Sequence, residues 1–337
     1  MFFQRLVNPG LIICLLLATA GAHAPSVAVD APDFQLTVIA NESGSLVRDS
    51  AARLVQTARE DGLDIRPELA SRPGERQAGA GSPELLIMPL RSLATQVPAL
   101  EILELPFLYA DTDNIHRAFD KDLGEVLREQ VRRQGWELLA LWDEGMHMLS
   151  GNRRYDRAIN LTGMEFILLR ADPVAEKQFT ALDAWTRKAQ PQTREQLLRE
   201  CMIGSRSASL QRLWYERLDR VHQDLSLSAH RYEGWVVITP SADWGRRNDK
   251  DKAALLQALS STTQWQRAEA QRREADALIQ LKTSGMRIHT LDAEQRAAFL
   301  ARLPAWETLL SDTLEHSLRQ KLVAAAATGV VERPNRQ

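Results

Sequence analysis

The residue types that most often carry out chemistry are present in this chain, but their spacing forms no catalytic or metal-binding pattern. The seven histidines are scattered, and no two have the spacing of a helical zinc site. No G-x-S-x-G elbow, G-x-G-x-x-G string or P-loop occurs, which argues against a serine hydrolase and against nucleotide binding. Asp143 and Glu144 are adjacent, so on a strand they would point to opposite faces and could not work as an acid and base pair. We therefore expect a protein that is not an enzyme and that needs neither a cofactor nor a metal.

The composition is that of an ordinary globular protein. The 337 residues are 44% hydrophobic and 26% charged, which excludes the disordered and fibrous classes. The net charge is only −2, so no basic field predicts nucleic-acid binding. Two cysteines, Cys14 and Cys201, cannot build a disulfide framework or a cysteine metal site.

The first two dozen residues have the pattern of a secretory signal. Arg5 precedes an apolar run over residues 11–18, and small residues follow. Cleavage fits after Ala22 or after Ala24, and we favour Ala22 because Pro25 would hinder the later cut. The signal peptide is thus predicted over residues 1–22, and an uncleaved membrane anchor is the alternative. We expect the mature protein to be exported.

The mature chain alternates between strand and helix patterns. Its first part reads as a strand at 34–40, a helix at 46–58, a strand at 63–69, a loop at 71–83 and a strand at 85–88. The remaining expected helices cover 115–131, 173–186, 194–201, 249–282, 292–303 and 306–327, and the remaining strands cover 136–142, 166–169, 232–239 and 286–291. This order is typical of an α/β fold.

Several segments, in order along the chain, carry a more specific signal. They are LATQVPALEILELPFLYAD at 93–111, GWELLALWDEG at 135–145, LTG at 161–163 and LSLSAH at 225–230. Together they resemble the periplasmic solute-binding proteins of tripartite ATP-independent periplasmic (TRAP) transporters. Matches spread over nearly the whole mature chain make this resemblance stronger than any single motif.

The resemblance implies a two-lobed α/β fold with hinge strands and a long helix that spans the lobes. Lobe I would comprise residues 25–145 with part of 236–290, and lobe II residues 146–235, with C-terminal helices 291–327 packing across both. Such a protein is periplasmic and captures a small organic ligand, usually an anion, by closing its lobes. Its partners would be the membrane permease subunits of the transporter.

The expected binding residues depart from the family pattern. In the family an arginine in the strand after L-K-G pairs with the ligand carboxylate, and here Ile167 stands at that place. Arg170 lies three residues further, an odd offset that would turn it to the other face of a continuing strand. A second family arginine is matched by His147, and the family's ligand-binding turn is matched by 204–209, with Arg206 in it.

The candidate ligand-binding residues are therefore polar groups near the replaced arginine together with aromatic walls. They are His147, Ile167, Arg187, Arg206, Trp142, Trp185 and Trp235. Each candidate also has an alternative in which it does not contact a ligand. Arg187 and Arg206 would then be solvated surface arginines, His147 a hydrogen-bonded interior histidine, and the tryptophans part of the core. The rival function is an interaction or sensory subunit that kept the fold and lost small-carboxylate binding.

Overall fold

The computed structural model describes residues 33–39, 45–70 and 84–327. The predicted signal peptide at 1–22 and the predicted loop at 71–83 lie outside these ranges. Within them, no helix is both long and apolar enough to cross a membrane.

The described strands form one nine-stranded sheet. The strands are β1 (Phe34–Ile39), β2 (Ile65–Ala70), β3 (Glu84–Pro89), β4 (Trp136–Gly151), β5 (Glu165–Leu168), β6 (Trp185–Lys188), β7 (Ser205–Ser209), β8 (Asp224–Pro240) and β9 (Arg287–Thr290). Their order is β2-β1-β3-β8-β4-β7-β5-β6, and β9 pairs with β8 off this path.

Two parallel groups of strands lie on either side of a long antiparallel pair. β1 pairs in parallel with β2 and β3, while β5 pairs in parallel with β6 and β7. β4 and β8 pair with each other in antiparallel fashion over most of their length, and each joins one of the parallel groups. The β4–β8 register shifts three times, so bulges bend the pair as it passes between the groups.

Helices cover this sheet. They are α1 (Ser45–Glu60), α2 (Leu90–Ala94), α3 (Thr112–Phe119), α4 (Asp122–Arg133), α5 (Pro173–Ala181), α6 (Arg194–Ile203), α7 (Leu210–Tyr215), α8 (Ser241–Arg246), α9 (Asp249–Thr283), α10 (Ala293–Arg302), α11 (Trp306–Leu309) and α12 (His316–Ala326). A 3₁₀ helix, η1 (Pro98–Glu104), follows α2.

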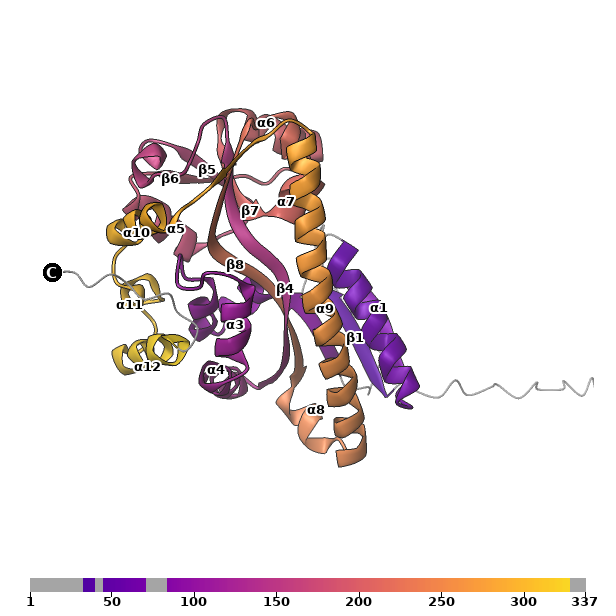
Figure 1. Ribbon diagram of the computed structural model, residues 1–337. Helices are drawn as coiled ribbons and strands as arrows, with labels where there is room; N and C mark the ends of the chain where they lie inside the picture. Colours follow the sequence, from indigo (N-terminus) through magenta and orange to yellow (C-terminus); the bar gives the residue numbers. More distant parts are fainter. Residues whose placement is uncertain (1–32, 40–44, 71–83, 328–337) are drawn as a thin grey trace, which may run out of the picture. The chain divides into compact units, whose positions relative to one another are not determined.

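The 35-residue helix α9 runs along β4, as Figure 1 shows. Asn248 caps its first turn by accepting a hydrogen bond from the backbone N–H of Asp251. The helix packs against α1, which follows β1, and against α7, which follows β7. Side chains of α9 also fix β4, since Gln266 bonds both backbone groups of Asp143. The long helix thus contacts elements from both parallel groups, and the predicted α/β class with a spanning helix is confirmed.

Some predicted elements differ from the observed ones in length. The expected helix 173–186 ends at Ala181, because Asp183 has a φ of 56° and the chain then enters β6. The expected helix 306–327 is divided into α11 and α12. The strand predicted at 136–142 continues through Gly151, and the one at 232–239 begins earlier, at Asp224.

Candidate ligand-binding site

A cavity of about 70 Å³ lies over the central strands, between the two parallel groups. It has room for a handful of water-sized groups, which matches a small organic molecule. The lining residues come from the end of β3 and from α2, η1, β4, β5, α5, β7, α7 and β8. They are Pro89, Arg91, Glu104, His147, Leu168, Leu169, Arg170, Asp172, Ala175, Arg206, Ser207, Arg212, Arg231, Glu233 and Gly234.

The lining carries more positive than negative charge. Five arginines and three carboxylates face the cavity, and two of these arginines also pair with buried carboxylates outside the lining, Arg206 with Glu216 and Arg212 with Glu144. Charges removed from water need partners of opposite sign. Among the described residues, Arg170 is the lining arginine without an ion pair, and its charge therefore favours an anionic ligand.

One wall is an ion-pair network that joins Arg91, Glu104, Asp172 and Arg231. Arg91 pairs with Glu104 at 2.6 Å and with Asp172 at 3.2 Å, and Arg231 Nη2 donates to Asp172 Oδ2 at 2.6 Å. Asp172 also caps α5, since it accepts from the backbone N–H of Ala175. Burial acts to raise the pKa of Asp172, but Arg231 and Arg91 hold it well below its usual range. Burial raises the pKa of Glu104 to about 7 against the opposing effect of Arg91.

Arg231 has hydrogen-bonding capacity that the protein does not use. Its side chain is buried, with 4% exposed, and its Nε and Nη1 find no partner among the residues that the structure describes. A buried donor without a partner costs about 1–3 kcal/mol. The side chain lines the cavity but both nitrogens are themselves buried, so a ligand oxygen would remove this cost only if the surrounding groups moved to let it reach them.

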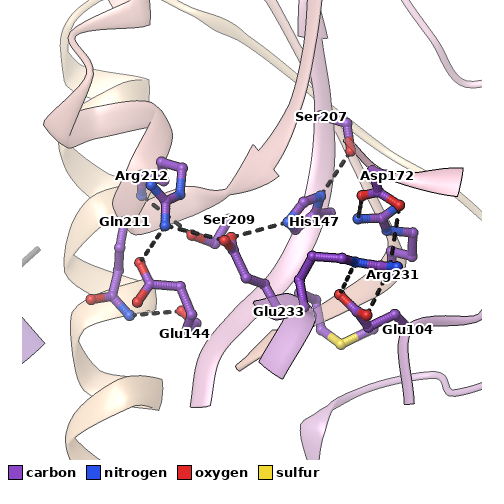
Figure 2. Close-up of polar contacts among 12 residues, drawn as sticks. Glu104, Glu144, His147, Asp172, Ser207, Ser209, Gln211, Arg212, Arg231 and Glu233 are labelled. Carbon is purple, nitrogen blue, oxygen red and sulfur yellow. Dashed lines mark hydrogen bonds and ion pairs between the residues drawn. The ribbon is translucent and has the colours of Figure 1, made fainter. Parts of the chain in front are cut away.

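The opposite wall is built around Glu233, as Figure 2 shows. Glu233 accepts from Arg212 Nη2 and from His147 Nε2, each at 3.1 Å, and His147 Nδ1 lies 2.9 Å from Ser207 Oγ. Burial acts to raise the pKa of Glu233, but Arg212 and His147 hold it well below its usual range. Burial lowers the pKa of His147, although Glu233 opposes this. Glu233 is thus ionised and His147 is neutral near pH 7.

Arg170 is a free cation at the cavity. In the described part of the chain it makes no hydrogen bond or ion pair, and its side chain is exposed and lines the cavity. The surrounding protein still lowers its pKa by burial, and Glu233 opposes that effect. Because β5 ends at Leu168, the alternation of a strand does not govern where Arg170 points. The odd offset from Ile167 therefore does not keep Arg170 from the cavity.

Two of the seven residues predicted from the sequence line the cavity, His147 and Arg206. Arg206 is already occupied: it donates to both carboxylate oxygens of Glu216 and to the backbone oxygens of Ile167 and Ser207. Ile167 is completely buried and does not face the cavity.

The other four predicted residues lie away from the cavity. Arg187, on β6, forms ion pairs with Glu165 on β5 and with Glu200 on α6. Trp142 is fully buried beside α9, where its Nε1 donates to Thr263, and Trp235 donates to Glu144. Trp185 is 51% exposed.

The sequence prediction did not include Arg91, Asp172 or Arg231. Arg231 had the clearest signal, since it directly follows the family-like segment 225–230. Asp172 precedes Pro173, which is a common way for a helix to start, so it indicated a cap rather than a site. Among the described residues, no group of three His, Cys, Asp or Glu side chains could hold a metal ion.

Comparison with known proteins identifies the family. Residues 76–312 match the family model DctP, described as bacterial extracellular solute-binding protein, family 7. The C4-dicarboxylate-binding periplasmic protein DctP of Rhodobacter capsulatus is 22% identical over 240 residues, which cover 70% of each chain. The C4-dicarboxylate-binding protein DctB of Bacillus subtilis is 22% identical over 61% of this chain and 59% of its own length. The alignment thus spans less than two thirds of that relative.

Solved structures agree on the fold. A TRAP periplasmic solute-binding protein from Sulfurospirillum deleyianum, solved with bound succinate, has a TM-score of 0.70 and 22% identity, covering 88% of this chain and 100% of that one. Another from Ochrobactrum anthropi has a TM-score of 0.74 and 22% identity, covering 87% and 94%. The family consists of binding proteins, so the prediction that the chain is not an enzyme is confirmed. The chain belongs to the DctP family, family 7 of the bacterial extracellular solute-binding proteins, as a distant TRAP-type member.

Proposed function

We propose that this chain is the extracytoplasmic solute-binding component of a TRAP-type transport system and that it holds a small organic anion in the cavity. One observation carries this proposal: Arg170 is an exposed cation at the cavity without a partner among the described residues, and Arg231, which also lines the cavity, has two buried donors that no described residue accepts. A carboxylate is the natural partner, because charge-assisted hydrogen bonds to guanidinium groups are among the strongest in proteins. The relatives named for C4-dicarboxylates support the same ligand class.

The usual arginine of the family is, in this proposal, replaced by Arg170. Ile167 stands at the family position and is buried in the core, while Arg170 comes just after the end of β5 and reaches the cavity. Arg231 would supply the second contact from β8. The buried donors of Arg231 also favour a ligand-binding role over the rival interaction or sensory role. Without a ligand, a buried donor that lacks a hydrogen-bond partner only lowers the stability of the fold.

Capture would proceed by closure of the two lobes proposed from the sequence, residues 25–145 with part of 236–290 and residues 146–235. The cavity lining supports this, because it draws on β3 and α2 from one parallel group and on β5, α5 and β7 from the other. Movement of one group toward the other would bring Arg91 and Arg170 to the same ligand. A TRAP permease would receive the ligand, and the predicted signal peptide would place the protein in the periplasm.

The test is a binding assay with small mono- and dicarboxylates on the purified protein. We expect Arg170→Ala to raise the dissociation constant about tenfold or more, because it removes a charge-assisted contact. Arg170 has no partner among the described residues, so this change should leave the fold intact. The matched control is Arg199→Ala, which removes an exposed arginine on α6 away from the cavity and should leave affinity within about twofold. Unchanged affinity in Arg170→Ala, or no binding of any carboxylate, would contradict the proposal.

A further inference from the structure

A chain of hydrogen bonds runs from the cavity into the protein interior through β4, β7 and β8. It begins at Glu233, whose Oε2 lies 3.1 Å from His147 Nε2. His147 Nδ1 lies 2.9 Å from Ser207 Oγ, which lies 3.0 Å from His230 Nε2. His230 Nδ1 lies 2.7 Å from Ser228 Oγ, so five polar side chains are connected in a row.

The charge of Glu233 fixes the direction of every bond in this chain. An ionised carboxylate only accepts, so His147 Nε2 must carry the ring proton. Burial lowers the pKa of both His147 and His230, so each ring is neutral and carries a single proton. His147 Nδ1 then accepts from the Ser207 hydroxyl, and the Ser207 oxygen accepts from His230 Nε2–H. Every hydrogen bond in this row therefore donates in the direction of Glu233. None of the five side chains has a proton left to donate to a ligand in the cavity.

Glu233 is the carboxylate that a ligand can best reach. Its side chain is 24% exposed, compared with 10% for Asp172 and 3% for Glu104. Its two oxygens accept from Arg212 and His147. A carboxylate has about four lone-pair sites, so part of its accepting capacity is left to the cavity.

Glu233 and the free cation Arg170 face the same small space. Both line the cavity of about 70 Å³, and each of the two charges shifts the pKa of the other. A single small molecule would therefore meet a strong donor and a strong acceptor together.

We propose that Glu233 is a specificity-determining residue that selects carboxylates bearing a hydrogen-bond donor, specifically a hydroxyl group, beside the carboxylate. The carboxylate would pair with the arginines, and the hydroxyl would donate to Glu233. A second carboxylate at that place would meet Glu233 as a like charge. This inference deepens the proposed function and rests on it.

A hydroxyl suits this place better than an ammonium group. Arg212 bonds Glu233 at 3.1 Å and Arg170 also acts on it electrostatically, so the negative charge of Glu233 already has two cations near it. An ammonium group would add a further positive charge next to them, whereas a hydroxyl offers its donor without charge.

The experiment compares acids that differ only in the group on one carbon. Dissociation constants of the wild-type protein are measured by calorimetry for succinate, L-malate and L-aspartate, and again for propionate, L-lactate and L-alanine. These acids carry hydrogen, hydroxyl and ammonium at the same position. We expect the hydroxy acid to bind at least about tenfold more tightly than the unsubstituted acid, with the amino acid between them.

Variants assign the preference to Glu233. Glu233→Gln should reduce the ratio between hydroxy and unsubstituted acid to about threefold or less, and Glu195→Gln, an exposed carboxylate on α6, should leave the ratio unchanged. In Glu233→Gln, Arg212 still has Glu144 at 3.8 Å as an ion-pair partner, so we expect the variant to fold. The unfolding midpoint of the variant is measured together with its affinities to check this. The wild-type series does not depend on that variant folding.

The outcomes separate this inference from the proposed function. Equal affinity for hydroxy and unsubstituted acids, or tighter binding of the amino acids, would overturn the inference and leave carboxylate binding intact. A ratio unaffected by Glu233→Gln in a folded protein would overturn the role of Glu233 alone. Absence of binding by all six acids would overturn the proposed function and this inference with it.

Discussion

The strands β7 and β8, which flank β4, each bring a buried arginine to the cavity, and the two arginines differ in what their nitrogens contact. Arg206 is 6% exposed and uses all three nitrogens, on Glu216 and on two backbone oxygens. Arg231 is 4% exposed, and among the described residues its Nη2 bonds Asp172 while Nε and Nη1 have no hydrogen-bond partner. Burial and charge are nearly the same in both. The two arginines therefore differ in how many of their donors the described residues accept, and this difference underlies the structural role of Arg206 and the binding role proposed for Arg231.

The largest expected effect follows from removing the satisfied arginine. Arg206→Met should lower the free energy of unfolding by about 3–5 kcal/mol, because it leaves the buried carboxylate of Glu216 without its close partner. The measurement is equilibrium denaturation in urea. Arg187→Met is the matched control, since the Arg187 side chain is about one-third exposed beside Glu165 and Glu200. Its loss should cost no more than about 1 kcal/mol. Equal losses in the two variants would show that burial of the Arg206 pair contributes nothing specific.

Removing the unsatisfied arginine should act on binding instead. Arg231→Met should raise the dissociation constant for a carboxylate about 10- to 100-fold. The free energy of unfolding should fall by only about 1 kcal/mol, because Asp172 keeps Arg91 at 3.2 Å and the backbone N–H of Ala175. Calorimetry and urea denaturation on the same protein provide both numbers. A large loss of stability with unchanged affinity would reverse the roles assigned to the two arginines.

The sequence predicted the fold better than the site because the fold depends on local patterns. The helix expected at 249–282 is observed as α9 (Asp249–Thr283), since a capping Asn248 and a repeating apolar stripe determine it locally. β4 was harder, because the strand predicted at 136–142 continues through the polar pair Asp143 and Glu144 as far as Gly151. The structure buries both carboxylates and gives them partners from distant segments, among them His116 and Trp235.

The site depends on which charges find a partner in the folded chain, and no local pattern shows that. The sequence holds 42 basic residues and 44 acidic ones, so nearly every arginine could be paired. Arg206 meets Glu216 only because α7 folds back beside β7. Arg170 has no partner among the described residues, and it reaches the cavity from a position two residues after the end of β5, a boundary finer than the sequence pattern defines. Alignment with a family therefore identified His147 and Arg206 as lining residues, but not the donors left without partners.

The smallest expected effect is a pH dependence of the affinity for a carboxylate. It distinguishes the wall that holds Glu104 from the wall that holds Glu233 and His147. Burial raises the pKa of Glu104 to about 7, while Arg91 and Arg231 oppose the shift and Asp172 and Glu233 add to it. Below pH 7 Glu104 is mainly protonated, so the lining carries one negative charge fewer and an anion should bind more tightly. As the pH rises from 6 to 8, Glu104 ionises and the affinity for a carboxylate should fall about threefold. Calorimetry across this range should show that Glu104→Gln, which stays neutral, abolishes most of the dependence. Asp172 remains ionised throughout, because its pKa is held well below its usual range, so a dependence that persists in Glu104→Gln would have to come from the Glu233 and His147 side of the cavity.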